Sequence, residues 1–339
     1  MKVMLAKTAG FCFGVKRAVD TVYEQIAQAE TNTETKKIFT FGPIIHNAEV
    51  VRDLEEKGVS VIESESDLPK IAGQILIIRS HGVARRVYEA AMAHDITVVD
   101  ATCPFVKKIH EIADRESQDG KYVLIVGDPS HPEVQGIMGW VRGQALVVKN
   151  EEEALRLRMP EDVPVTVVAQ TTFQCKKFNN IVEIIQKKGY HIRVINTICN
   201  ATRLRQEEAE SVSRQSDIMF VIGDRRSSNT QKLFDICRSY CKDTYYIQTV
   251  KDLDRQEIAK ALVSVCTAAE EESKAGLSAA QTAETTETAG ATPAAEDAYV
   301  TDHDLRSGII VGITAGASTP NNIIQEVFLT CQKKKISTR

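Results

Sequence analysis

Three stretches of the sequence decide its fold: MLAKTAGFCFGVKRAVD at residues 4–20, TVVDATCPFVKKIHEIAD at 97–114 and RVINTICNATRLRQEEAE at 193–210. In each stretch, a short run typical of a β-strand leads to a cysteine, and a segment with helical periodicity and many charged side chains follows. Cys12, Cys103 and Cys199 therefore lie at three similar strand–turn–helix junctions. They are 91 and 96 residues apart, and such a regular spacing indicates a repeated structural unit.

Two further landmarks recur after each cysteine. The first is a buried-strand pattern that ends in a glycine and a polar turn, with the glycines at Gly42, Gly127 and Gly223. The second is a strand that ends in small polar residues, and Ser80 and Gln170 mark it 68 and 67 residues after their cysteines. The third copy reaches the equivalent Thr314 only 115 residues after Cys199. This excess indicates an insertion in the third copy.

The insertion spans residues 267–304, which are rich in alanine, threonine and glutamate and lack apolar periodicity. Such a segment buries too little apolar surface to offset its ordering entropy, so we expect a disordered loop. It carries nine acidic side chains and one lysine, a net charge of −8. The whole chain has a net charge of −4, so the residues outside the insertion carry a net charge of +4. This mildly basic body fits a small anionic ligand or an acidic protein partner, and it is too weakly charged for a nucleic-acid partner.

Length and composition narrow the class of protein. The 339 residues and the 43% hydrophobic content are typical of a soluble globular protein with two or three domains. No apolar run approaches the roughly 18 residues of a membrane span, and the N-terminus lacks the pattern of a signal peptide. We therefore expect a cytoplasmic protein without a membrane partner, in which the eight cysteines remain thiols.

The alternation of strands and helices predicts α/β units with parallel strands and right-handed crossovers. The repeats predict three such units, residues 1–98, 99–194 and 195–333, the last interrupted by the insertion 267–304. Ligands of open α/β sheets bind beyond the carboxyl ends of the strands, where all the landmarks lie. A pseudo-threefold arrangement would bring the three cysteines together, in a trefoil of units around a central cluster.

Three converging thiolates suit a soft metal centre, either zinc or an iron–sulfur cluster. A structural zinc site normally completes its tetrahedron with a fourth cysteine or histidine, whereas three cysteines leave one position open. A 4Fe–4S cluster held by three thiolates would have one iron free to bind a substrate. The cysteine pattern by itself leaves zinc and the cluster equally open.

Polar residues at the turn landmarks indicate an anionic ligand. Histidines, hydroxyls and amides at strand ends beside helix N-termini suit a phosphate-bearing molecule. No GxxxxGK(S/T) loop and no GxGxxG motif occurs, which argues against a P-loop or an ordinary dinucleotide site. The candidate binding residues are His46, His81, His131, Ser227, Ser228, Asn229 and Ser318.

Glu133 is the carboxylate that lies at a turn beside one of these histidines, two residues after His131 in the segment HPEVQG. A glutamate in a closed, apolar-walled pocket has a raised pKa and can hand over a proton. Thr171 and Thr172 lie at a landmark of the second unit. A hydroxyl there could relay a proton or orient a substrate hydroxyl.

Together these motifs resemble the 4-hydroxy-3-methylbut-2-enyl diphosphate reductase family, whose members complete the methylerythritol phosphate route to isoprenoids. The resemblance covers the chain from end to end, in family order, apart from the insertion 267–304. The matching segments are GFCFGVKRAV, GPIIHN, RSHGV, DATCPFV, HPEVQG, QTT, ICNATRLRQ, RRSSN and TAGASTP.

The resemblance implies a trefoil around one 4Fe–4S cluster that Cys12, Cys103 and Cys199 ligate. It implies that Glu133 donates the proton and that Thr171 holds the substrate hydroxyl near it, while the histidines, serines and asparagine named above bind the diphosphate. The implied reaction uses two electrons and two protons to remove an allylic hydroxyl as water, giving isopentenyl and dimethylallyl diphosphates. A ferredoxin or flavodoxin-type carrier would supply the electrons.

Two other functions stay open beside this one. A cluster-dependent dehydratase would use the same open iron without net electron transfer, and it would turn over without a reductant. A zinc-stabilised anion-binding module would carry out no chemistry. It would be colourless and contain zinc, whereas an iron–sulfur protein is brown.

Deletion of residues 267–304 is expected to leave reductase activity within a few-fold of the full chain, because the repeat comparison places this segment in a loop. Anaerobic steady-state rates of the two proteins provide the measurement. A shortened chain that loses its metal centre would show that the segment is structural.

Overall fold

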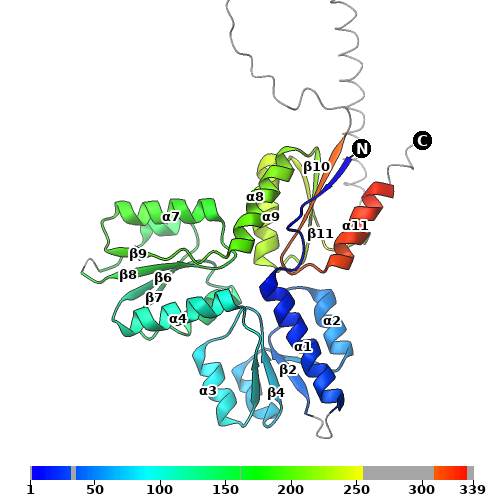
Figure 1. Cartoon of the computed structure of the whole chain (residues 1–339). Coiled ribbons are helices and arrows are strands. Elements are labelled where there is room, and N and C mark those ends of the chain that lie inside the picture. Colours follow the sequence, from blue (N-terminus) through cyan, green and yellow to red (C-terminus); the bar gives the residue numbers. More distant parts are fainter. Residues whose placement is uncertain (1, 32–35, 161, 255–308, 334–339) are drawn as a thin grey trace, which may run out of the picture.

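The computed structural model describes residues 2–31, 36–160, 162–254 and 309–333 (Figure 1). The expected disordered insertion at 267–304 lies outside these residues. In the described part of the chain, the strands form three four-stranded sheets in which all pairings are parallel. Figure 1 shows three lobes around a common centre. The predicted α/β trefoil is thereby confirmed.

The first sheet has the strand order β3-β2-β4-β5. Its strands are β2 (Ile38–Phe41), β3 (Ser60–Ile62), β4 (Ile75–Ile78) and β5 (Thr97–Asp100). One face packs against α1 (Phe13–Thr31) and α2 (Ala48–Glu56). The other face packs against the 3₁₀-helix η1 (Glu65–Ile71) and α3 (Arg85–Ala93).

The second sheet repeats this arrangement with the order β7-β6-β8-β9. Its strands are β6 (Tyr122–Val126), β7 (Ala145–Val148), β8 (Val165–Ala169) and β9 (Ile192–Val194). The helices on one face are α4 (Pro104–Gln118) and α5 (Pro132–Met138). Those on the other face are α6 (Glu151–Arg156) and α7 (Cys175–Lys187).

The third sheet has the order β1-β12-β10-β11. Its strands are β1 (Lys2–Leu5), β10 (Ile218–Ile222), β11 (Asp243–Ile247) and β12 (Ile310–Ala315). The helices α8 (Asn200–Arg214) and α9 (Ser228–Tyr240) cover one face. The 3₁₀-helix η2 (Val250–Asp254) and α11 (Asn321–Lys333) cover the other.

Strand β1 departs from the unit boundaries that the repeats predicted. Lys2 pairs with Ile310 and Leu5 with Ile313, so this strand belongs to the sheet of the third unit and not to a unit of residues 1–98. The boundary at residue 98 also falls inside β5. The reason is that one edge strand of each sheet, β1, β5 or β9, leads directly to a cysteine. The third sheet obtains this strand from the start of the chain, which closes the ring of units.

Helices on both faces explain why the central strands read as continuous apolar runs. The strands YVLIV, IMFVI and IVGITA are buried almost throughout. The helices that cover them bury one apolar stripe each, as amphipathic helices do. None of the helices within the described ranges combines the length and the apolar character that crossing a membrane requires.

Candidate active site

A cavity lies at the carboxyl ends of strands from all three sheets. All twelve residues that the sequence analysis proposed for binding or catalysis line its wall. They are Cys12, His46, His81, Cys103, His131, Glu133, Thr171, Cys199, Ser227, Ser228, Asn229 and Ser318. The structure thus brings the predicted residues to one place, and their individual roles stay predictions.

Each cysteine is fixed by the same backbone contact to a neighbouring strand end. The amide N–H of each cysteine donates to a backbone carbonyl oxygen. The distances are 3.3 Å from Cys12 to Ala317, 2.9 Å from Cys103 to Ser80 and 3.1 Å from Cys199 to Thr171. Each cysteine carbonyl also accepts the first helical hydrogen bond of α1, α4 or α8. All three thiols therefore lie at helix N-termini, where the positive end of the helix dipole favours negative charge.

The thiols are crowded and poorly solvated. A Cβ atom at Gly14 would lie 2.4 Å from the Sγ of Cys103, so this thiol reaches the first turn of the helix that follows Cys12. Burial raises the pKa of the Cys103 thiol to about 11, and the charge of Cys12 adds a smaller effect. Burial also raises the pKa of Cys199. Thiolates at these positions need a compensating cation, which a soft metal centre supplies.

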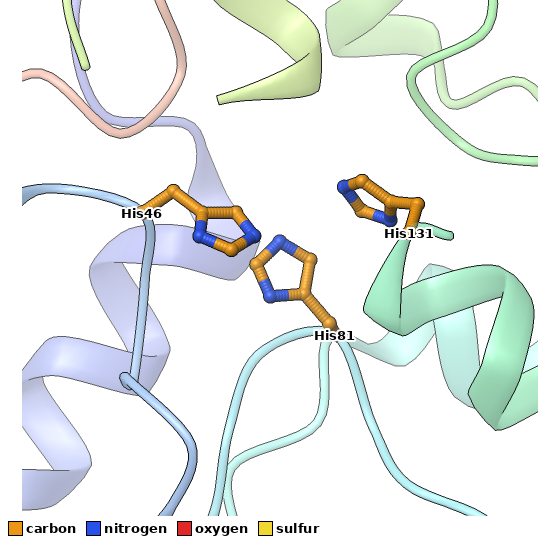
Figure 2. Close-up of side chains that lie close together, drawn as sticks. All are labelled: His46, His81 and His131. Atoms are coloured by element: carbon orange, nitrogen blue, oxygen red, sulfur yellow. The ribbon is translucent and has the colours of Figure 1, made fainter. Parts of the chain in front are cut away.

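Three histidines that line the same cavity face one another (Figure 2). The ring centroids of His46 and His81 are 4.6 Å apart, and those of His131 lie 5.8 and 5.2 Å from these two. His131 caps α5, because its Nδ1 accepts a hydrogen bond of 3.1 Å from the N–H of Glu133. Both ring nitrogens of His46 and the Nδ1 of His81 have no hydrogen-bond partner among the described residues. These nitrogens are available to a ligand.

The histidine rings are neutral at pH 7. Burial lowers the pKa of His46 to about 4 and that of His131 to about 3, and it also lowers the pKa of His81. The positive charge of Arg79 contributes to all three shifts. The histidine nitrogens lie within 4.8 Å of one another and could hold a metal ion. The nearby guanidinium disfavours a cation at this place and favours an anion.

The third unit contributes hydroxyl and amide groups to the same cavity. Ser227 caps α9 by accepting from the N–H of Thr230 at 3.3 Å. The Oδ1 of Asn229 accepts from the N–H of Ala317 at 2.9 Å, and its Nδ2 has no partner in the part of the chain that the structure describes. Ser318 donates to the carbonyl of His46 at 3.0 Å, which joins the third unit to the first.

Glu133 is enclosed between the histidines and the cysteines, with 1% of its surface exposed. Thr171 donates to both carboxylate oxygens, from its N–H to Oε1 at 2.6 Å and from its hydroxyl to Oε2 at 2.7 Å. Burial raises the pKa of Glu133 to about 7, although these two hydrogen bonds oppose the shift. Glu133 can therefore hold a proton at neutral pH and release it, as a general acid must.

A family model described as LytB protein matches residues 3–332. The chain belongs to the LytB family. A relative from Caldanaerobacter subterraneus subsp. tengcongensis, named 4-hydroxy-3-methylbut-2-enyl diphosphate reductase, is 38% identical over 97% of this chain and 96% of its own length. A relative of the same name from Geobacter sulfurreducens is 48% identical over 75% of this chain and 86% of its own.

Two solved structures also resemble this LytB chain. The E-1-hydroxy-2-methyl-but-2-enyl-4-diphosphate reductase of Plasmodium falciparum superposes with a TM-score of 0.76 at 26% identity, covering 97% of this chain and 87% of that one. A second structure is titled as (E)-4-hydroxy-3-methyl-but-2-enyl diphosphate reductase, the terminal enzyme of the non-mevalonate pathway. It gives a TM-score of 0.59 at 33% identity, covering 98% and 100% of the two chains.

The sequence analysis missed Arg205, which also lines the cavity of this LytB chain. Only 4% of its surface is exposed. In the sequence it lies in RLRQEEAE, which has the appearance of a solvated helix face. The available signal was its helical spacing from Thr202 and Ala209, which places these three residues on one side of α8.

Replacement of Gly14 by alanine is expected to reduce the metal content of the protein while the fold persists. The new methyl group would meet the Sγ of Cys103 at 2.4 Å and displace this thiol. Iron and sulfide per chain after anaerobic reconstitution provide the measurement, with circular dichroism as the check on folding. Gly143→Ala is the matched control, because a Cβ at Gly143 has nothing within 4 Å. Equal metal content in the two variants would contradict the expectation.

Proposed function

We propose that this chain reduces 4-hydroxy-3-methylbut-2-enyl diphosphate to isopentenyl and dimethylallyl diphosphates. The observation that carries the proposal is the convergence of three thiols, a buried protonatable glutamate and three neutral histidines on one cavity. The names of the LytB relatives, at 38% and 48% identity, support the same substrate. The reaction consumes two electrons and two protons and releases the allylic hydroxyl as water.

Cys12, Cys103 and Cys199 would hold one 4Fe–4S cluster. When bound, such a cluster supplies single electrons and an open iron that acts as a Lewis acid, chemistry that side chains lack. The three half-buried thiols at helix N-termini fit this cofactor, and three thiolates leave incomplete the tetrahedron of a structural zinc ion. The close approach of Cys103 to Gly14 brings its sulfur to the first turn of the helix that follows Cys12, which supports a shared ligand set.

The histidine end of the cavity would bind the diphosphate. His46 and His81 offer nitrogens that have no hydrogen-bond partner among the described residues, and Ser227, the N-cap of α9, lines the same cavity. Neutral imidazoles can donate hydrogen bonds to phosphate oxygens without the desolvation cost of a charged ring. Binding at this end is remote from the reacting carbon, so its free energy can position the allylic hydroxyl.

Glu133 would deliver a proton to the departing hydroxyl. Hydroxide is a poor leaving group, so its loss as water requires a proton at the moment of cleavage. The hydroxyl of Thr171, 2.7 Å from Oε2 of Glu133, lies where it can hold the substrate hydroxyl against this carboxyl group. The enclosed wall excludes water and strengthens these contacts.

The two electrons would come from a ferredoxin or flavodoxin-type carrier in the cytoplasm. Such carriers are acidic proteins, and the chain outside residues 267–304 has a net charge of +4, which suits them. An anaerobic assay of the allylic diphosphate with a reduced carrier tests the whole proposal. Formation of both product diphosphates only in the presence of the carrier supports it. Turnover without a reductant would favour a dehydratase, and a colourless zinc protein would favour an anion-binding module.

Glu133→Gln is expected to retain the cluster and the substrate affinity and to lose turnover by at least about 100-fold, because the amide cannot donate an acidic proton. Anaerobic kcat, substrate binding and the visible spectrum of the variant provide the measurement. Glu111→Gln removes an exposed glutamate from α4 and serves as the control. A near-normal rate for Glu133→Gln would exclude Glu133 as the proton donor.

The rate is expected to fall as the pH rises above about 7, because Glu133 titrates there and only its protonated form is an acid. The hydroxyl of Thr171 stabilises the carboxylate, so Thr171→Val should raise the pKa and move the decline in kcat/KM to higher pH. Thr172→Val removes a hydroxyl that contacts Ser228 and Gln170. This variant should leave the pH of the decline in kcat/KM unchanged. A shift of the Thr171→Val profile to lower pH would contradict this assignment.

A further inference from the structure

Helix α8 is hydrogen-bonded to the loop that carries Cys12. The guanidinium of Arg205 donates from Nε and Nη2 to the carbonyl of Thr8, at 2.8 and 2.5 Å, and from Nη2 to the carbonyl of Gly10 at 2.7 Å. One helical turn further, Glu208 accepts from the N–H groups of Lys7 and Thr8 at 2.7 and 2.8 Å. The N–H of Cys12 makes only a long hydrogen bond, of 3.3 Å, to Ala317, while its carbonyl accepts from Lys16 at 2.9 Å. Its position therefore depends on the segment that Arg205 holds.

Arg205 also has an unused donor inside the cavity. Its Nη1 is buried and has no hydrogen-bond partner among the described residues, and its charge interacts with the thiolates of Cys12 and Cys199. A buried guanidinium with an open N–H is costly unless a negative group lies against it. Arg205 and the three cysteines line the same cavity. A negatively charged thiolate centre would supply the missing partner.

Arg17 of α1 makes a similar contact to the loop before Cys103, where it donates to the carbonyls of Thr102 and Asp100, but only the third unit has a charge at the position six residues after its cysteine. Arg205 follows Cys199 by six residues, and the residues at the same distance from Cys12 and Cys103 are Ala18 and Ile109. Both are fully buried apolar side chains. The repeat therefore needs an apolar residue here for packing, and the third copy departs from the rule where α8 meets the loop that joins β1 to α1. A departure from a packing rule at a site of function is typical of a functional residue.

We propose that Arg205 is a positioning residue for Cys12 and that its charge makes the cysteine-held cluster easier to reduce. This inference rests on the proposed function, because it concerns the cluster that the three thiols would bind. A fixed positive charge beside a cluster favours the more negative, reduced state and so raises the reduction potential. The two effects can be separated, because lysine preserves the charge but cannot reach both carbonyl oxygens with a rigid fork.

Redox titration of the reconstituted holoprotein, followed by electron paramagnetic resonance, tests the charge. We expect Arg205→Gln to lower the midpoint potential by about 59 mV or more, a tenfold change in a one-electron equilibrium, and Arg205→Lys to stay near the wild type. Arg203→Gln removes a half-exposed charge from the same helix, where it pairs with Glu207, and should shift the potential little. Equal potentials for Arg205→Gln and Arg203→Gln would overturn the electrostatic part of the inference.

Hydrogen exchange of the peptide containing residues 8–13 tests the positioning, with no need for turnover. In both Arg205→Lys and Arg205→Gln, the amide hydrogens of this peptide should exchange faster than in Arg203→Gln. Both variants should also lose iron faster to a chelator. If Arg205→Gln holds no cluster at all, Arg205→Lys carries this test alone. Exchange and iron loss at the Arg203→Gln rates would overturn the positioning role. A wild-type protein without a cluster would instead overturn the proposed function itself, together with this inference.

Discussion

Three backbone hydrogen bonds, one from each of Cys12, Cys103 and Cys199 to the end of the neighbouring strand in the same sheet, fix the positions of the three thiols. Each bond places a thiol where a strand has ended and a helix begins. The carboxyl ends of strands from all three sheets meet at the shared cavity. The cavity, the histidines and the buried glutamate all follow from this arrangement, because each lies on a turn directly after one of these strands.

The electrostatics of the centre are matched to negative ligands. Helix N-termini, Arg79 and Arg205 supply positive potential, while burial keeps the histidines neutral and lets Glu133 retain a proton near neutral pH. An enclosed site without its ligands therefore carries buried donors that lack partners, such as the Nδ2 of Asn229 among the described residues. Such donors are stabilised when a diphosphate or a thiolate-held cluster occupies the cavity. The site is thus arranged to bind negatively charged ligands.

Much of this arrangement could be predicted from the sequence, because repeats carry geometry as well as composition. The recurrence of a cysteine after a strand was enough to place three distant residues on one cavity, and the turn landmarks placed His46, His81 and His131 beside them. The sheet that contains β1 could not be predicted in this way, because strand partners depend on the closure of the ring and not on local pattern. Arg205 was missed for a related reason: its burial depends on a loop almost two hundred residues away in the chain.

The most direct measurement of the central claim is the iron and sulfide content of anaerobically purified protein, compared with single replacements of Cys12, Cys103 and Cys199 by serine. The account predicts four irons and four sulfides per chain in the native protein, and a strong loss in each of the three variants. Cys175→Ser, which alters a cysteine at the start of α7 outside the cavity wall, should keep the native content. Any one of the three replacements that left the content unchanged would contradict a shared centre.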